Sequence, residues 1–204
     1  MSARRIATVA LAAIACTVAA VVAPGAGAQE VELGPGGQVT SITARITAVL
    51  DGETVRVRTS RGRTRIVQLA GVDVPVVRKD GAVECGAMPA LDSLMRRAFT
   101  KSRDTDGDGL RDTAGGSGRK VLVTTEPGAK APRGRLWAYV EPTGTGGQFN
   151  VIQLLGGWSR LDDRDGSLAQ GANLAAAQFA AQQQRAGVWG SCNGDFHVDG
   201  SVIY

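Results

Sequence analysis

Residues 42–69, ITARITAVLDGETVRVRTSRGRTRIVQL, contain two stretches in which apolar and polar side chains alternate, followed by a turn and a third stretch that we expect to return as a strand. This period of two is typical of a β-strand that buries one face and leaves the other in water. The first stretch is Ile42–Ala48, the second is Val55–Arg58, and the third is Arg63–Leu69. Ser60-Arg61-Gly62 separates the last two as a turn. The sequence therefore predicts a meander of three strands.

The remainder of the chain changes between helical and strand patterns. Leu91, Leu94, Met95 and Ala98 recur at the spacing of one helix face. Also expected are strands at Val121–Val123 and Leu136–Val140, a short helix from an Asn150 N-cap through Leu155 to Gly156-Gly157, and a last helix over Leu174–Ala186 followed by Gly187. Five strands that bury one face are best satisfied by closing into a small barrel, because closure removes exposed edges. We expect one mainly β domain with some α content, a five-stranded barrel with three helices.

The first 28 residues have the layout of a secretory leader. Arg4 and Arg5 provide a charged start, Ile6–Ala23 is apolar, and Ala26-Gly27-Ala28 fits a signal-peptidase site. We expect cleavage after Ala28, a secreted mature chain, and no membrane contact once the leader is removed. Residues 29–40 lack apolar periodicity and are expected to be a flexible lead-in. An uncleaved membrane anchor is the alternative.

Net charge gives little guidance about partners. The chain carries 23 Lys and Arg against 19 Asp and Glu, a net charge of +4. Without Arg4 and Arg5 the count is 21 against 19, so the net charge falls to +2. This balance permits nucleic-acid binding but does not argue for it, because phosphate binders usually cluster their basic residues on one face.

The cysteines and the single histidine indicate which covalent links and metal sites to expect. Export places the chain in an oxidising space, where the pair Cys85 and Cys192 predicts a disulfide; two free thiols are the alternative. The one histidine, His197, excludes most His-based zinc sites. We expect it on the surface of a C-terminal tail at 193–204.

Three short motifs carry a family resemblance. Val49-Leu50-Asp51-Gly52-Glu53-Thr54-Val55 and Leu69-Ala70-Gly71-Val72-Asp73-Val74-Pro75 each place a carboxylate after a β-branched run, and Gly134-Arg135-Leu136-Trp137-Ala138-Tyr139 leads into a later strand. With these motifs, residues 41–192 resemble the staphylococcal, thermonuclease-type nuclease family. The resemblance implies an OB-type barrel, calcium-dependent hydrolysis of DNA or RNA, and nucleic acid as the partner. We expect the protein to be a monomer.

The same motifs name a candidate site. By resemblance, Glu53 and Asp73 are calcium ligands, Asp51 lies in the same loop, and Arg135 contacts the scissile phosphate. Calcium accepts carboxylate oxygens from Asp or Glu, so Glu53 at a family Asp position alters the metal site without removing it. The alternative is that Asp51 and Glu53 only shape the turn before the second strand.

At two other positions of the family active site, this chain has a residue of a different chemical type. Gln68 stands where the family has an Arg, and it brings no charge to offset the negative charge that develops on the phosphate. Val76 stands where the family has the Glu that orients or deprotonates the attacking water, and valine accepts no proton. We therefore expect weak or lost phosphodiesterase activity. The alternative function is a non-catalytic extracellular domain, stabilised by calcium, with a binding or structural role.

A second calcium pattern lies in the Asp- and Gly-rich segment 101–118, which interrupts the domain. Asp104, Asp106, Asp108 and Asp112 follow the pattern D-x-D-x-D-G-x-x-D. Alternate carboxylates project to one side of such a turn. The pattern is similar to the short calcium loops of dockerin and thrombospondin repeats, and we expect calcium here; a plain acidic turn is the alternative.

Overall fold

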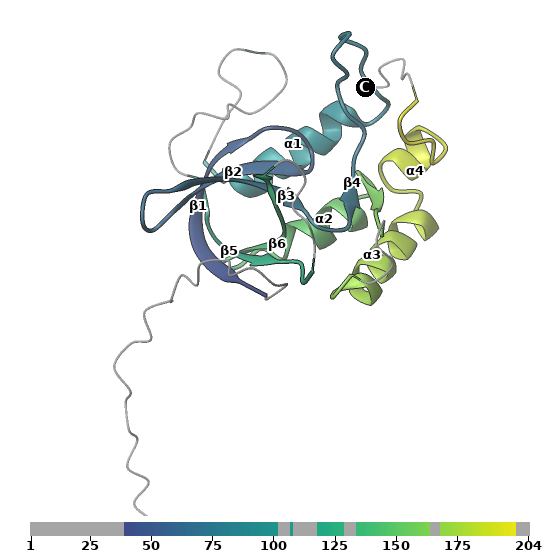
Figure 1. The fold of residues 1–204 in the computed structure, drawn as a ribbon. Helices are drawn as coiled ribbons and strands as arrows, with labels where there is room; N and C mark the ends of the chain where they lie inside the picture. The colour runs from purple at the N-terminus through teal and green to yellow at the C-terminus, as the bar shows by residue number, and fades with distance from the viewer. Residues whose placement is uncertain (1–38, 102–106, 108–117, 129–133, 164–167, 199–204) are drawn as a thin grey trace, which may run out of the picture.

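Five strands close into a barrel in the computed structural model, which describes residues 39–101, 107, 118–128, 134–163 and 168–198 (Figure 1). The strands are β1 (Ser41–Val49), β2 (Thr54–Thr59), β3 (Thr64–Leu69), β5 (Lys120–Thr125) and β6 (Leu136–Pro142). Around the barrel they follow the order β1-β2-β3-β6-β5. All neighbours are antiparallel except β3 and β6, which are parallel. This closed, mixed barrel confirms the predicted OB-type architecture.

Alternation along the strands explains the interior of the barrel. On β2, Val55 and Val57 are fully buried, whereas Arg56 and Arg58 face outward. The inward residues of the other strands join them in one core: Ala44, Ile46, Val67, Leu69, Val121, Val123, Ala138 and Val140. Removal of these apolar side chains from water is the main force that favours closure.

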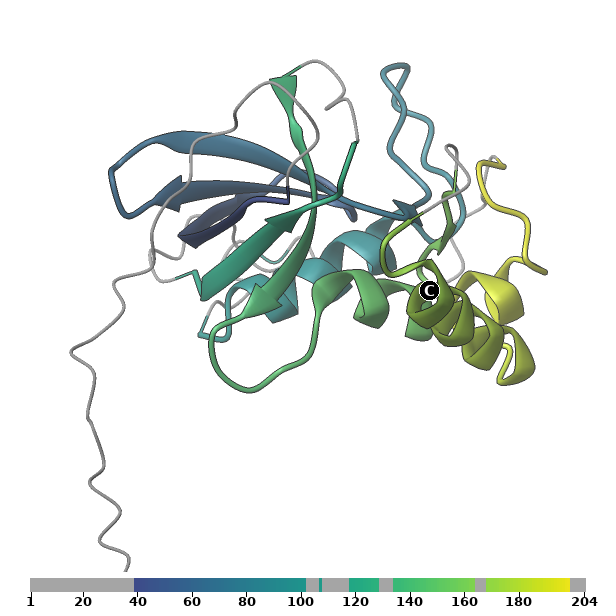
Figure 2. The ribbon, with the colours of Figure 1, turned by 60° about the horizontal axis from the view of Figure 1, so that its bottom comes forward.

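Four helices lie among the described residues: α1 (Ala87–Ala98), α2 (Phe149–Leu155), α3 (Gly171–Gln183) and the one-turn α4 (Val188–Ser191). The apolar face of α1 joins the barrel core, as its spacing predicted. α3 and α4 lie on the side of the molecule opposite the β2–β3 hairpin (Figure 2). Within the described ranges, no helix has the length and apolar character needed to cross a membrane.

Three small elements were not predicted. Strands β4 (Val72–Asp73) and β7 (Arg160–Leu161) form a separate two-stranded antiparallel sheet. Helix α4 follows α3 closely, and Gly187 is its N-cap instead of a residue that simply ends the previous helix. Each element is too short to show a period in sequence, because two to four residues cover only about one repeat.

Asn150 lies inside α2, where we had expected the N-cap, and the N-cap is Gln148. The Asn150 side chain is fully buried, and its Oδ1 accepts a hydrogen bond from Val140 N at 3.0 Å. Its Nδ2 donates to Ala70 O at 2.8 Å and to Ala138 O at 3.1 Å. This amide therefore ties α2 to the barrel instead of capping the helix.

The start of α3 is held by a buried carboxylate. Glu126, directly after β5, accepts a hydrogen bond from the Tyr139 hydroxyl and another from Ala169 N at 2.9 Å. The Tyr139 oxygen in turn accepts one from Gln170 N at 3.2 Å. Burial, and then the contact with Glu126, raises the pKa of Tyr139 above its ordinary value. The phenol therefore stays protonated and continues to donate.

A disulfide joins Cys85 to Cys192, with Cα atoms 6.1 Å apart. It confirms the predicted pairing and links α4 to the segment before α1. Residues 193–198, which we had placed in a tail, pack at the same point. Cys85 N donates to Val198 O at 3.2 Å, and Phe196 is buried against Trp189. The C-terminal part of the described chain is thus an integral piece of the domain.

Candidate functional site

The loop between β1 and β2 carries the first candidate carboxylates. Asp51 Oδ1 accepts a hydrogen bond from Glu53 N at 2.9 Å, which is the pattern of an Asx turn. Gly52 packs closely against α1, because a Cβ there would lie 3.0 Å from Ala90 Cβ. Gln153 Nε2 donates to Gly52 O at 2.6 Å from α2. The two helices thus set the position of both carboxylates.

Glu53 is held as a neutral acid. Its Oε1 accepts a hydrogen bond from Gln68 Nε2 at 2.7 Å. Burial, followed by the negative charges of Asp51 and Asp73, raises the pKa of Glu53 from 4.5 to about 8. At neutral pH the side chain is therefore mostly protonated, and a protonated carboxyl is a poor ligand for calcium. The hydrogen bond from Gln68 acts in the other direction and lowers the pKa, but burial and the two aspartates outweigh it; an arginine at this position would favour the ionised acid more strongly.

Asp73 lies in the short sheet that β4 and β7 form. The register places it opposite Arg160, and Arg160 Nε donates to Asp73 Oδ2 at 2.7 Å. His197 approaches from the C-terminal segment, and its Nε2 lies 3.1 Å from each Asp73 carboxylate oxygen. Both oxygens of Asp73 are therefore engaged by residues of the chain itself.

His197 also reaches a second carboxylate. Its Nδ1 lies 2.8 Å from Glu84 Oε2, which accepts a further hydrogen bond from Val76 N at 2.8 Å. Burial by itself lowers the pKa of His197. The hydrogen bonds and charges of Asp73 and Glu84 outweigh that effect, and the pKa is raised above its ordinary 6.5. A ring with a carboxylate at each nitrogen is best satisfied as an imidazolium that donates at both ends.

We call Asp73, Glu84, Arg160 and His197 the Asp73 cluster. With the ring protonated, two carboxylates face one guanidinium and one imidazolium, so the cluster balances its own charge. A calcium site needs several anionic or carbonyl oxygens free to turn toward the ion. Among the described residues, no group of three or more His, Cys, Asp or Glu side chains has the arrangement that could hold a metal ion. As they are arranged here, both Asp73 oxygens are taken by Arg160 and His197, and calcium at the barrel site stays a prediction.

The structure brings some of the predicted site residues together and leaves others apart or undescribed. Asp51, Glu53 and Asp73 are brought together, since the charges of the two aspartates act on Glu53. Arg135 lies half-buried just before β6, and within the described ranges it forms no hydrogen bond or ion pair. The predicted calcium residues of the inserted segment, Asp104, Asp106, Asp108 and Asp112, lie outside the described residues.

Sequence reasoning missed His197 and Arg160. The expectation of a surface histidine on a tail was wrong, because His197 contacts Asp73 and Glu84, which lie 124 and 113 positions away. Its backbone has a φ of 63°, an uncommon left-handed conformation for a residue other than glycine. The one available signal was that His197 is the single histidine of the chain.

A scan against models of known protein families finds no match to this chain, and a search of curated proteins finds none either. Function is therefore inferred from the geometry of the Asp73 cluster and the barrel around it.

Proposed function

We propose that this chain is an exported, thermonuclease-like barrel in which phosphodiester hydrolysis is lost or nearly lost, and which acts as a non-catalytic binding domain. The observation that carries the proposal is the double pairing of Asp73. Arg160 and His197 engage both oxygens of the carboxylate that would have to hold a cation. A carboxylate satisfied in this way gains little from a metal ion, because the ion would first have to displace two charged partners.

The remaining groups supply little of the chemistry that hydrolysis needs. Water attack on a phosphodiester requires positive charge near the phosphate and a base near the water. The Gln68 amide is bound to neutral Glu53 and brings no charge. Glu84 is the nearby carboxylate that follows Val76 in the chain, but its Oε2 already accepts from Val76 N and faces His197. Arg135 alone remains for the phosphate.

A binding role is supported by what the chain has kept. The barrel is closed, its core is filled, and a disulfide secures the C-terminal segment. OB-type barrels commonly serve as binding scaffolds, but fold alone does not name a ligand. Loss of catalytic groups without loss of packing is what we expect of a domain that is retained for binding.

A nuclease assay tests the proposal. The chain from Gln29 onward is incubated with single-stranded DNA, duplex DNA and RNA, with calcium and with a chelator. We expect turnover at or near background in every case. A robust calcium-dependent activity that Arg135→Ala abolishes, and that the matched surface change Arg185→Ala leaves intact, contradicts the proposal.

A restoration series separates the missing groups from the paired carboxylate. Gln68→Arg with Val76→Glu and Glu53→Asp returns the family residues but leaves Asp73 paired, so we expect little gain. Adding Arg160→Ala and His197→Ala frees Asp73, and only this combination should show calcium-dependent cleavage. If the first set alone restores cleavage, the Asp73 cluster is not what blocks the site.

A further inference from the structure

The outside of the barrel carries a group of cations without acidic partners. Arg45 lies on β1, Arg56 and Arg58 lie on β2, and Lys120 begins β5; all four are exposed. We call these four residues the basic face. Strands β1, β2 and β3 contain no Asp or Glu. In the part of the chain that the structure describes, no residue of the basic face forms an ion pair.

Strand register places these cations next to one another. Arg45 is the Cα partner of Arg58 on one side and of Lys120 on the other. The three side chains therefore form a row across three strands, with about 4.8 Å between strands. Arg56 lies two residues further along β2, about 7 Å from Arg58. Like charges placed directly opposite each other destabilise a sheet. A partner rich in negative charge would therefore offset the repulsion among these cations.

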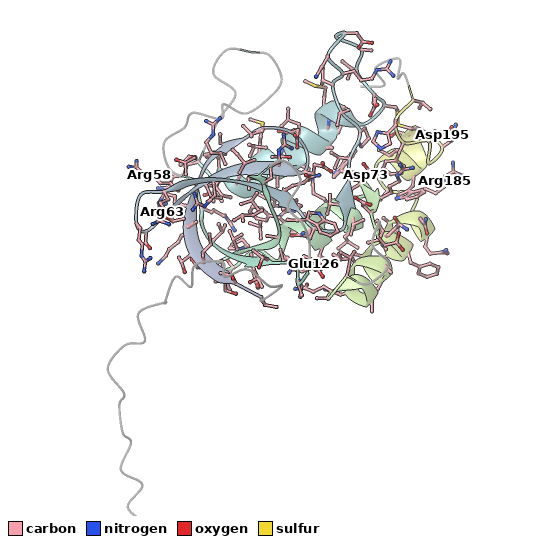
Figure 3. All side chains as sticks on the ribbon, in the orientation of Figure 1. Arg58, Arg63, Asp73, Glu126, Arg185 and Asp195 are labelled. Carbon is pink, nitrogen blue, oxygen red and sulfur yellow. A yellow bond between two sulfur atoms is a disulfide. The ribbon has the colours of Figure 1, made fainter. Side chains whose placement is uncertain are left out.

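The basic face and the hairpin turn next to it lie apart from the Asp73 cluster. Arg61 and Arg63 occupy the turn between β2 and β3, and both are exposed. Figure 3 shows Arg58 and Arg63 at one side of the molecule and Asp73 toward the other. A partner on the basic face would therefore leave the Asp73 cluster untouched.

We propose that the basic face binds a surface of anionic lipid headgroups. The outside of a closed barrel is convex, and the cations spread both along and across the strands, which suits an array of separate phosphates. Guanidinium groups match phosphate oxygens in a bidentate manner. Leu122 is 37% exposed and lies two residues after Lys120, with Thr43 as its cross-strand partner. It adds an apolar side chain at the level of the headgroups, which strengthens peripheral binding.

A nucleic-acid strand is the competing polyanion, and the basic face is poorly built for it. Residues 39–98 contain no Phe, Tyr or Trp, so these strands offer no aromatic platform on which bases could stack. Single strands are usually held in a positively charged groove, whereas this face bulges outward. The basic face ends at β6, where the exposed Glu141 is the Cα partner of Leu122. The mature chain was expected to have no membrane contact, and the basic face argues for a peripheral one.

This binding goes beyond the proposed function, which concerns the Asp73 cluster. The two fail separately, since lipid binding is measured without any nucleic acid and hydrolysis is measured without lipid.

Vesicle binding tests the inference. The chain from Gln29 onward contains the whole described domain and omits the apolar stretch at 6–23, which would bind lipid by itself. It is sedimented with vesicles of phosphatidylcholine alone and with vesicles that contain an equal part of phosphatidylglycerol. We expect binding only to the anionic vesicles, weakened by added salt. Arg45→Gln, Arg56→Gln and Arg58→Gln together should lower the partition coefficient about a hundredfold.

A matched control carries the same loss of charge elsewhere. Lys79, Arg97 and Arg185 are exposed and lie outside the basic face, so changing all three to Gln should leave vesicle binding intact. Circular dichroism and melting temperature establish that both triple variants fold. Absence of binding to anionic vesicles at low salt, equal binding to neutral vesicles, or an equal loss in the control overturns the inference. Tighter binding of a single-stranded or duplex oligonucleotide than of vesicles at the same salt, lost in the Arg45 triple variant, also overturns it and makes this face a nucleic-acid surface.

Discussion

Glu53 and His197 are the side chains whose protonation should control how stability depends on pH. The pKa of Glu53 is about 8 in the folded chain against an ordinary 4.5. The folded state therefore keeps a proton that the unfolded chain releases above pH 4.5, and stability falls progressively between about pH 4.5 and pH 8. We expect Glu53→Gln to remove this fall, with a gain on the order of 2–4 kcal/mol near pH 8. Urea unfolding measured across this range checks it.

His197 should act in the same direction over a higher range of pH. Its pKa is raised, so its contribution is fully present below the ordinary value of 6.5 and is lost as pH rises through the folded value. His197→Asn should therefore lower stability at pH 6 more than at pH 9, whereas Glu53→Gln should have the larger effect at pH 9. A His197→Asn variant whose loss of stability is the same at both pH values would contradict the ion-pair account.

Sequence reasoning reached some residues of the site and could not reach others. Asp51 and Asp73 were named as site residues because the motifs around them, each a carboxylate after a β-branched run, resemble those of the nuclease family. The partners of Asp73 were not, because Arg160 and His197 are 87 and 124 positions away and nothing local marks either one. Residues so far apart in sequence could be placed together only from a known fold. The family motifs that this chain resembles include no histidine next to the position of Asp73.

At the scale of elements, the disulfide and the segment after it behave as one unit. Cys192 ends α4, Cys85 precedes α1, and Cys85 N also holds Val198 O. His197 reaches Asp73 and Glu84 from the same segment. Loss of the bridge should therefore loosen the Asp73 cluster as well as the chain end.

We expect Cys85→Ser with Cys192→Ser to lower the free energy of unfolding by about 2–4 kcal/mol. The same variant should lose hydrogen-exchange protection at residues 193–198 before the barrel strands do. Thiol titration of the unfolded, unreduced chain from Gln29 should find none, and two titratable thiols would refute the bridge. Reduction of the unmodified chain, without any substitution, should reproduce the destabilisation.

Long elements were predictable from sequence, whereas short ones and buried amides were not. β1 and α1 each contain enough residues to show a period of two or of about 3.6. β4 and β7 have two residues each, so their pairing depends on the packing of the barrel and α3. Asn150 was assigned to a cap because Asn is common there, but its tertiary hydrogen bonds to Ala70 and Ala138 determine its place.

At the scale of the whole molecule, charge is segregated in a way that composition hides. The net charge of +2 expected for the mature chain averages the basic face on β1, β2 and β5 with acidic residues elsewhere. The absence of Asp and Glu from the first three strands is visible in the sequence. Which cations are neighbours is not, because cross-strand pairs depend on the register, and a shift by one residue turns every side chain to the other face.

Calcium should therefore act on this protein away from the barrel site. Because Glu53 is neutral in the ion-free chain and Asp73 is paired, we expect stabilisation by calcium to come from Asp104, Asp106, Asp108 and Asp112. Binding to the folded state alone stabilises by mass action, and millimolar calcium at ten times the dissociation constant should raise the melting temperature by about 3–5 °C. Asp106→Asn with Asp108→Asn should remove most of this rise, while Glu53→Gln should leave it.

A rise that Glu53→Gln abolishes would place calcium in the barrel and contradict the pairing of Asp73. No rise at all, with no heat of binding at millimolar calcium, would mean that the Asp-rich segment is a plain acidic turn.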